Sequence, residues 1–484
     1  MAEAEKRARS PKGLPPDNFQ QDQNSAEEAS NTTNQDDSAR GKDDKTRLYV
    51  LCGSALMQLP LWGEHRLHLK IVFLLTFLGF LMSYGIFEEY WTSNWTLQGD
   101  VDITGVIGTT SNGIIYISMP FLFAIFTRYW ARFRLRAELC GIVIAFLGFI
   151  LSSFSTHVWH LMVTQGILAA FGCTLVYSPA TCSLGEWYAT GNRAVAYGII
   201  FSSKNIVGST CPFLLRYLLD QYGFRWTIRI WSFILAGSGL LSIFLVPTHP
   251  SKMTPSGEKP PRIPWTFLKH RGIYIYCIAT ILQSSGYCLP QNYLPSFARD
   301  FSDASQAIST LLLTLHNIPG IFSSFFFGWL TDNKYHQFSA STTTCLSAFT
   351  ASASVFLLWG FSTQGSSTVV LIFTIVFGFF ASGYSATWGG ITKELEHEAE
   401  KYDETIDSSL TYGLLNGARG IGFVSGGLVS IPLLNSEDNS WGGRFGYGTK
   451  YGPLMVFTGI AVAFGGLGLL RTFKLPHNRA STSG

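Results

Sequence analysis

Charged side chains are scarce in this chain. Asp, Glu, Lys and Arg make up 13% of the 484 residues, whereas hydrophobic residues make up 47%. This balance excludes an ordinary set of soluble domains. Residues 141–154, 231–246 and 451–470 contain no charged residue, and each run approaches the roughly 20 apolar residues with which a helix crosses a hydrocarbon core about 30 Å thick. The bilayer is therefore the expected solvent, and helices are expected because they satisfy their own backbone hydrogen bonds in lipid.

Other features are also missing, and each absence removes a class of function. The formal net charge of +3 is too small to support a nucleic-acid partner. The cysteines form no CxxC pair and lie near no histidine cluster, so we expect no metal, no cofactor and no disulfide framework. They lie in or beside apolar segments, at Cys52, Cys140, Cys173, Cys182, Cys211, Cys277, Cys288 and Cys345. Residues 1–46 lack an apolar stretch long enough for a signal peptide, and we interpret them as a disordered cytosolic tail.

What the sequence does contain is two sets of six apolar spans. The first set lies near residues 69–91, 104–127, 138–156, 160–182, 194–219 and 227–247. The second set lies near residues 272–297, 306–331, 339–361, 367–391, 409–434 and 451–473. A polar, proline-rich linker separates them at residues 248–271. We therefore predict an all-α integral membrane protein with twelve transmembrane helices in two pseudo-symmetric six-helix bundles, residues 47–247 and 272–474, followed by a cytosolic tail at 475–484.

The distribution of Lys and Arg predicts the orientation. With both termini in the cytosol, the inside loops and linker carry most of these cations, and the outside loops carry only Arg225, Arg229, Arg299, Arg444 and Lys450. Residues 48–62 are also apolar, but they are too few for a crossing, and we interpret them as an interfacial or partly inserted segment.

Two cations stand at matching positions inside the fifth and eleventh spans. A Tyr-Gly pair precedes Lys204 and Arg419 at the same spacing, which is typical of two related halves. Each cation lies roughly 15 Å into its helix at a rise of about 1.5 Å per residue. A charge at that depth costs at least about 2.5–3.5 kcal/mol, so we expect Lys204 and Arg419 to contact substrate in a polar cavity. The alternative is a purely structural bond to the carbonyls of a neighbouring helix.

The eighth span contains a second candidate site. His316 and Asn317 precede Pro319 and Gly320, and we expect the proline and glycine to interrupt the helix and expose backbone groups to a cavity. His316 could relay protons there, or it could be a packed neutral imidazole.

The remaining polar residues within spans have two open interpretations. Gln283, Asn205 and Asn416 could orient a solute, or they could join helices by hydrogen bonds. The spacing of Gly422 and Gly426 favours helix packing.

Two acidic segments are interpreted as solvated. Glu88 and Glu89 close the first span at its outer end, where a carboxylate is easily hydrated; the alternative is a role in coupling to protons. Residues 393–407 are rich in Glu and Asp, which is typical of a solvated loop between spans ten and eleven.

Recognisable motifs occur in the stretches 185–199, 222–229, 293–298, 328–332 and 413–422. They resemble motifs of fungal monocarboxylate-transporter-like proteins of the major facilitator superfamily, and the resemblance covers residues 48–473. The resemblance implies the major facilitator fold and transport that is proton-coupled or facilitated. It also implies gating roles for Gly328 and Asp332 in the inner loop after the eighth span, and for Glu186 and Arg193 after the fourth.

The sequence departs from this family pattern at three places. Residues 126–130 lack the Gly and Asp of the matching first-half loop. Ser324 stands where monocarboxylate carriers have a substrate-binding Arg, so a lactate-like solute held in that way is not supported. Residues 64–79 interrupt the first span, which suggests a retained intron or gene-model error, testable by sequencing the transcript.

Together these features favour a secondary active or facilitated transporter that works as a monomer by alternating access. Its partners would be membrane lipid and a small organic solute, with a monocarboxylate or another anion among the candidates and a proton as co-transported ion. The expected location is the plasma or vacuolar membrane. The main alternative is a non-transporting nutrient sensor with a transporter fold. An enzyme is not favoured because no nucleophile, acid pair or metal cluster stands at membrane depth, and a channel is not favoured because no pore-loop signature recurs.

Overall fold

The computed structural model describes part of the chain, all of it within one compact unit, residues 50–484. The described residues are 83–94, 97–99, 103–126, 133–187, 193–245, 268, 270–302, 304–332, 338–365, 367–401, 406, 408–435 and 445–471. The interpretations of residues 1–46, 48–62, 64–79 and 475–484, and of nearly all of the linker, fall outside these ranges.

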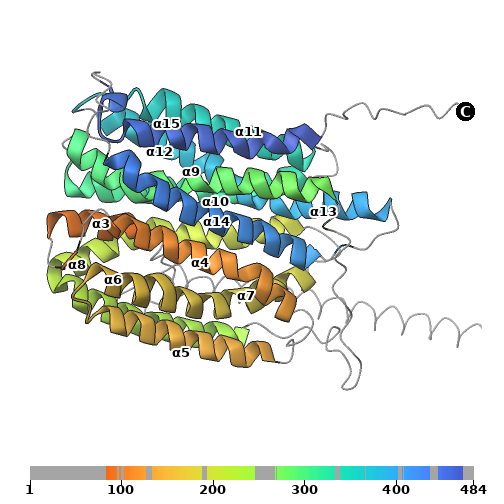
Figure 1. Cartoon of the computed structure of the whole chain (residues 1–484), viewed down its shortest axis with the longest axis horizontal. Helices are drawn as coiled ribbons and strands as arrows, with labels where there is room; N and C mark the ends of the chain where they lie inside the picture. Colours follow the sequence, from red (N-terminus) through yellow and green to blue (C-terminus); the bar gives the residue numbers. More distant parts are fainter. Residues whose placement is uncertain are drawn as a thin grey trace, which may run out of the picture. The chain divides into compact units, whose positions relative to one another are not determined.

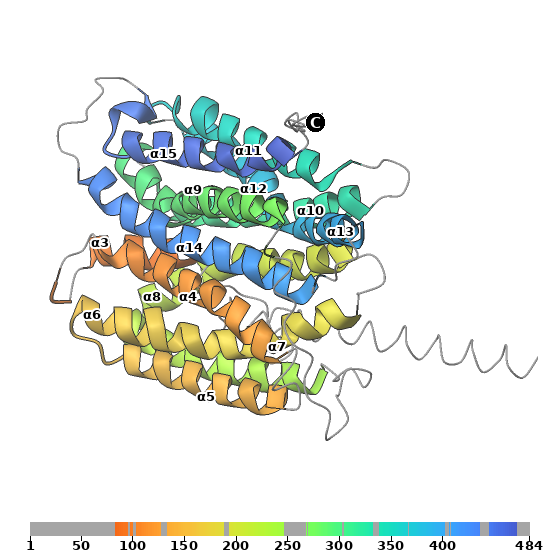
Figure 2. The same cartoon turned by 45° about the vertical axis from the view of Figure 1, so that its right-hand side comes forward.

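Helices account for nearly all of the described chain. The first half contains α3 (Tyr84–Ser93), α4 (Thr104–Ala124), α5 (Arg134–Ser152), α6 (Val158–Leu161), the π-helical η5 (Met162–Ala169), α7 (Ala170–Trp187) and α8 (Arg193–Leu245). The second half contains α9 (Arg271–Ser302), α10 (Gln306–Asp332), α11 (Ala340–Ser354), η8 (Val355–Trp359), α12 (Ser367–Ala386), α13 (Trp388–Glu400), α14 (Ser408–Leu434), η9 (Gly446–Gly448), α15 (Gly452–Ala463) and η10 (Phe464–Arg471). The long helices lie side by side, and their connections alternate between two ends of the bundle (Figures 1 and 2).

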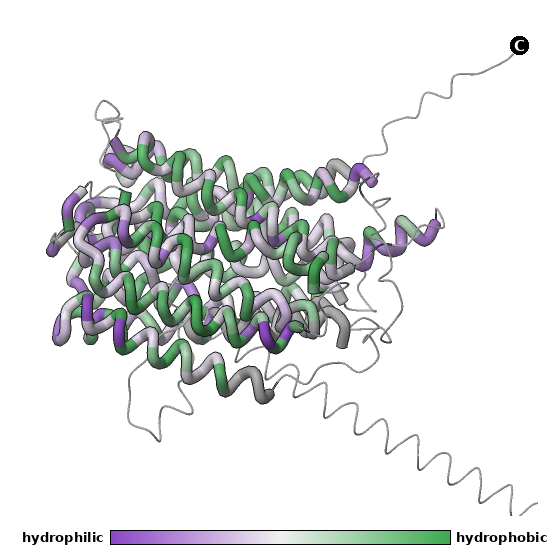
Figure 3. The backbone as a smooth tube through the Cα atoms, turned by 60° about the horizontal axis from the view of Figure 1, so that its bottom comes forward, coloured by the Kyte–Doolittle hydropathy of each residue, from purple (hydrophilic) through white to green (hydrophobic). Residues whose placement is uncertain are grey.

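These helices have the length and composition of membrane spans. Nine of the described helices are long and apolar enough to cross a bilayer. Large apolar side chains stand exposed on their outer faces, including Phe121 at 68%, Phe322 at 66% and Phe233 at 65%. Exposed apolar surface on this scale is stable only against lipid or a partner, and Figure 3 shows hydrophobic residues along the lengths of the helices. The predicted all-α membrane fold is confirmed.

Gly223 divides α8 into two arms. Its φ of 69° and ψ of 174° are non-helical, in a region of backbone space that is essentially restricted to glycine. The two arms, residues 193–222 and 224–245, correspond to the fifth and sixth predicted spans. We call the end of the bundle that holds this bend the Gly223 end, and the opposite end, from which α13 projects in Figure 1, the α13 end.

The two halves meet along matching helix pairs. α8 packs along α10, α4 packs along α14, and α3 packs against α9. Glycines allow the backbones to approach closely: a Cβ built on Gly420 would lie 2.5 Å from Ile117 N on α4. On the other face of α14, a Cβ on Gly422 would lie 2.4 Å from Ile281 O, and one on Gly426 would lie 2.2 Å from Ser285 O of α9. The predicted packing role of Gly422 and Gly426 is confirmed.

Two local predictions were wrong. α10 runs without interruption through Pro319. Membrane-spanning helices tolerate proline where neighbouring helices satisfy the freed backbone groups. Gly320 gives room to Asn205, whose Nδ2 would lie 2.6 Å from a Cβ built on that glycine. The acidic segment at 393–407 begins as helix α13, which continues to Glu400. Glu394 accepts hydrogen bonds from Ala340 N and from the Tyr276 hydroxyl, so it holds α13 to the start of α11.

Candidate functional site

Arg419 lies at the centre of an aromatic cage. It is the twelfth residue of α14 and lies roughly 16 Å along that helix at about 1.5 Å per residue, and only 5% of it is exposed. Its guanidinium carbon lies between 5.1 and 5.7 Å from the centroids of four rings. These rings belong to Tyr116 of α4, Tyr287 of α9, Trp388 of α13 and Phe423 of α14. Tyr116 comes from the first half, so both halves enclose this one charge.

The rings explain how Arg419 tolerates its depth. A cation over an aromatic face gains from about 0.5 to about 2 kcal/mol, depending on desolvation. Four such contacts offset the insertion cost of about 2.5–3.5 kcal/mol. Ring faces do not satisfy the N–H donors of the guanidinium, however, and Arg419 Nε is buried without a hydrogen-bond partner among the described residues. The charge is thus stabilised while hydrogen-bonding capacity is retained.

Asn416 lies one turn before Arg419 on α14. It is fully buried, and its Nδ2 donates to Tyr412 O at 2.8 Å. Its Oδ1 has no hydrogen-bond partner in the described part of the chain. Asn416 therefore combines a helix-bound donor with an available acceptor beside the cage.

His316 belongs to the same aromatic cluster. Its ring centroid lies 6.1 Å from that of Tyr287 and 5.8 Å from that of Phe377, and 1% of the residue is exposed. Tyr287 also contacts Arg419, so one ring connects α10 with the cage. The sequence predicted His316 and Arg419 separately, and the structure brings them to the same tyrosine.

Asn205 and Asn317 lie on the seam between the halves. Asn317 Nδ2 donates to Gly208 O of α8 at 3.2 Å and to Leu313 O of its own helix at 2.8 Å. Asn205 Nδ2 donates to Ser324 Oγ at 3.3 Å, so Ser324 of α10 pairs with α8. These amides use their donors to hold α8 against α10.

The other predicted site residues do not lie among the residues of the Arg419 cage, or their side chains are not described. Gln283 is 4% exposed and packs against η10, where its Cγ would lie 2.9 Å from a Cβ on Gly465. Gly328 is buried in α10. The side chains of Lys204, Glu186, Arg193 and Asp332 lie outside the described part of the chain, although their backbones belong to α8, α7, α8 and α10.

A buried ionic cluster joins the halves at the Gly223 end, and the sequence did not predict it. Glu89 of α3 is 2% exposed and pairs with Arg216 of α8 at 3.2 Å and with Arg299 of α9 at 3.8 Å. Its neighbour Glu88 is 8% exposed and accepts a hydrogen bond from Ser296 of α9. The predicted solvation of both carboxylates was therefore wrong, because α9 of the second half covers the end of α3.

A second ion pair extends this cluster along the same end. Lys450 Nζ lies 2.9 Å from Asp300 Oδ2, and the Tyr451 hydroxyl donates to the same carboxylate at 3.0 Å. Burial, and then the charge of Asp300, hold the pKa of Tyr451 well above its ordinary value. The phenol therefore stays protonated and donates at physiological pH.

The paired bundles, the apolar outer faces and a caged charge between the halves define a membrane transporter. The Major Facilitator Superfamily model matches residues 71–427, and the chain belongs to this family. The predicted superfamily is thereby confirmed, whereas the monocarboxylate-transporter-like subgroup stays a prediction.

Curated relatives and a solved structure agree with this assignment. "MFS-type transporter hasB" of Aspergillus fumigatus is 25% identical over 83% of this chain and 88% of its own length. "MFS-type transporter 1" of Ophiocordyceps sp. is 24% identical over 64% of this chain and 66% of its own length. "Fujikurins efflux protein" of Gibberella fujikuroi is 22% identical over 65% of each chain. The nucleoside transporter NupG aligns with a TM-score of 0.60 at 15% identity, over 89% of this chain and 100% of its own, which shows the shared fold.

Proposed function

We propose that this protein is a secondary transporter that moves a small organic anion by alternating access, with Arg419 as the anion-binding residue. The observation that carries the proposal is the buried guanidinium enclosed by rings from both halves. A carboxylate can bind such a guanidinium through two parallel N–H···O bonds, and Asn416 Oδ1 offers an acceptor for a solute hydroxyl or amide. The aromatic walls favour a solute with a planar or apolar body.

The ionic cluster at the Gly223 end would act as one gate. The Glu89–Arg299 pair joins α3 to α9, and Ser296 joins α9 to Glu88. Separation of the halves at this end breaks both contacts, whereas the Glu89–Arg216 pair stays within the first half. A gate of this kind favours the closed state without blocking the motion, because the broken partners become hydrated at the membrane surface.

The charge distribution supports a cytosolic α13 end. Arg134, Arg136 and Lys393 belong to helices that meet this end. Lys450, Arg299 and the arginines that follow Gly223 lie at the other. An excess of Lys and Arg marks the cytosolic side. An epitope tag at each terminus should therefore react in cells only after the membrane is permeabilised.

His316 is the proposed carrier of a co-transported proton. Its ring lies near Tyr287, which also contacts Arg419, the proposed substrate-binding residue. An imposed pH gradient should drive accumulation of the solute by the wild type. His316→Gln should abolish this accumulation but leave the rate of solute exchange at equal pH unchanged. Equal accumulation by both proteins would remove His316 from the coupling step.

The proposal is tested by counterflow in proteoliposomes that contain the purified full chain. The candidate solutes for this assay are those that raise the melting temperature of the protein, because a ligand stabilises the state that it binds. Arg419→Gln should lower the exchange rate at least tenfold, and Arg419→Lys should recover only part of it because it loses the two-point bond. The control is Arg136→Gln on α5, an exposed arginine at the α13 end, which should leave the rate unchanged.

Two results would count against the proposal. Normal exchange by folded, membrane-inserted Arg419→Gln would show that the caged cation is structural. Ligand binding without exchange of any bound solute would favour the sensor alternative.

A further inference from the structure

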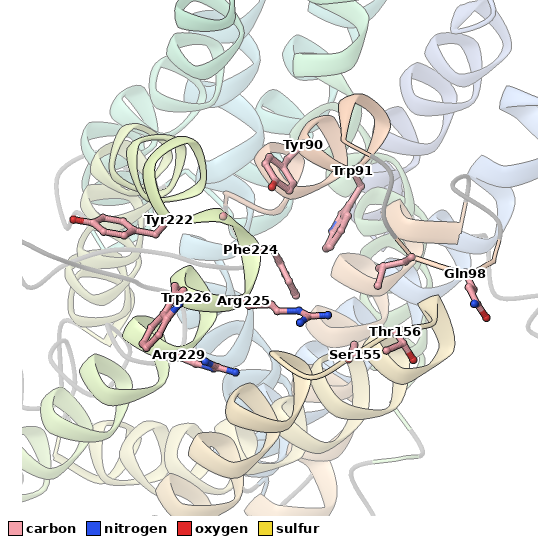
Figure 4. A pocket seen from close by; sticks show the side chains of 12 residues that line it. Tyr90, Trp91, Gln98, Ser155, Thr156, Tyr222, Phe224, Arg225, Trp226 and Arg229 are labelled. Carbon is pink, nitrogen blue, oxygen red and sulfur yellow. The ribbon is translucent and has the colours of Figure 1, made fainter.

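A pocket, separate from the Arg419 cage, opens at the Gly223 end of the first half. Its volume is about 640 Å³, within the range of about 300–1,000 Å³ that is usual for small-molecule sites. Figure 4 shows the surrounding side chains, which come from the end of α3, the loops around residues 97–98 and 155–156, and the bend of α8. The ionic cluster and Arg419 are not among its lining residues.

The bend at Gly223 builds the pocket. It turns Phe224 inward, where its ring lies 4.6 Å from that of Trp91 and closes one wall. The opposite wall is fixed by backbone hydrogen bonds from Gln98 N to Thr156 O at 2.9 Å and from Val158 N to Gln98 O at 3.1 Å. Both walls therefore exist before any ligand binds, which reduces the entropy lost on binding.

The lining is positively charged. It contains Arg225 and Arg229, one helical turn apart, and its described residues include no acid. Nearby Arg216 and Arg299 are paired with Glu89, whereas neither pocket arginine has an ion pair with a described residue. Among the described residues of this end, these two guanidinium groups therefore lack the acidic partner that Arg216 and Arg299 have.

Arg229 is held in place by groups other than acids. Its Nε donates to Ser153 Oγ at 3.1 Å, and its guanidinium carbon lies 4.8 Å from the Phe154 ring centroid and 5.0 Å from that of Trp226. These contacts fix the plane of the guanidinium and leave its two terminal nitrogens to donate. Ser155, which also lines the pocket, is 6% exposed, and its Oγ has no hydrogen-bond partner in the described part of the chain.

We propose that this pocket is a second binding site that takes an anion, a carboxylate or a phosphate, attached to an aromatic or other apolar body. The arginines would hold the anionic group, because guanidinium matches the geometry of both oxyanions. Tyr90, Trp91 and Trp226 would contact the body. Such a ligand can come from free solution as an organic acid or from the bilayer as a lipid headgroup, and the experiment separates these sources.

The test measures binding to the purified full chain in nanodiscs. In neutral phosphatidylcholine discs, 2-naphthoate is titrated while tryptophan fluorescence is followed, with uncharged 2-naphthamide as the ligand control. In a second arm, discs contain phosphatidic acid, and retained lipid is measured by native mass spectrometry. The variants are Arg225→Gln alone, which removes no described hydrogen bond, and Arg225→Gln with Arg229→Gln. Arg136→Gln is the matched control.

We expect the dissociation constant of 2-naphthoate to rise at least threefold in the single variant and at least tenfold in the double variant, with no change in the control and no binding of 2-naphthamide. This result supports a soluble organic anion. Loss of retained phosphatidic acid in the same two variants, without naphthoate binding to the wild type, supports the lipid source. The proposal is overturned if the two arginine variants match Arg136→Gln in both arms. Binding is measured without transport, so this outcome is independent of the role of Arg419.

Discussion

Replacement of Glu89 by Gln tests whether the ionic cluster closes the Gly223 end. Glu89 pairs with arginines of both halves, Arg216 at 3.2 Å and Arg299 at 3.8 Å. The amide is nearly isosteric with the carboxylate, so the substitution removes charge with little change in packing. The variant should populate the open form of this end more than the wild type does.

The size of the shift follows from the contacts. Removal of one partner from a fully buried ion pair costs about 3–5 kcal/mol, but only the Arg299 pair is broken when the halves separate. The Arg299 side chain is 31% exposed and keeps Asp300 at 3.4 Å, so its pairing with Glu89 is worth closer to about 1–1.5 kcal/mol. Because about 1.4 kcal/mol is a factor of ten, the ratio of open to closed molecules should rise about tenfold.

Spin labels at Gln98 and Gln364 would report this ratio as a distance distribution. Both positions are exposed, and they belong to opposite halves. The control is Glu400→Gln on α13, which alters the contact between Glu400 and His397, two side chains that are 71% and 80% exposed. If Glu89→Gln gives the same distribution as Glu400→Gln, the cluster does not hold this end closed and the reasoning is refuted.

Three further substitutions test the packing. Gly223→Ala should destabilise the protein by about 1–3 kcal/mol through backbone strain alone, because no atom lies within 4 Å of the added methyl group. The control Gly237→Ala, at an equally open but helical position, should be neutral or stabilising. Equal melting temperatures for the two variants would contradict backbone strain at Gly223. Gly426→Ala places its Cβ 2.2 Å from a backbone carbonyl oxygen of α9. It should sharply reduce the yield of folded protein in size-exclusion chromatography. A yield equal to that of the wild type would show that α14 can move away from α9. Asn317→Leu removes two hydrogen bonds and should lower stability by about 1–3 kcal/mol in thermal unfolding, with an unchanged midpoint as the contrary result.

The sequence predicted what local patterns determine. Apolar runs and turn residues defined the spans, so the predicted range 409–434 nearly coincides with α14 (Ser408–Leu434), and the range 306–331 nearly coincides with α10 (Gln306–Asp332). The depth of a cation within a span is also local information. For this reason Arg419 could be selected as a buried charge before any contact was known.

Contacts between distant segments could not be predicted in this way. Glu89 was interpreted as solvated because it closes a span, yet its burial depends on Arg299, which lies 210 positions away. The aromatic cage has the same origin: Tyr116 and Trp388 are ordinary core residues in sequence, and only the fold brings them to one guanidinium. The error at Pro319 is of another kind, since the helix-breaking tendency of proline was outweighed by the packing of α10 between its neighbours.

The arginines show how surroundings determine role when residue type does not. Arg134 donates from Nε and Nη2 to Phe126 O at 3.1 and 2.9 Å, so it binds the backbone at the end of α4. Arg216 is compensated by carboxylates. Among the described residues, Arg419 is surrounded by ring faces, and Arg225 faces a pocket whose described lining has no acid. An arginine whose hydrogen-bonding capacity is met by protein is structural, whereas one that is stabilised without being hydrogen-bonded can still bind an anion. Among the buried and pocket-lining arginines of the described chain, this criterion selects the Arg419 cage and the pocket at Gly223 as the places where an anionic solute should bind.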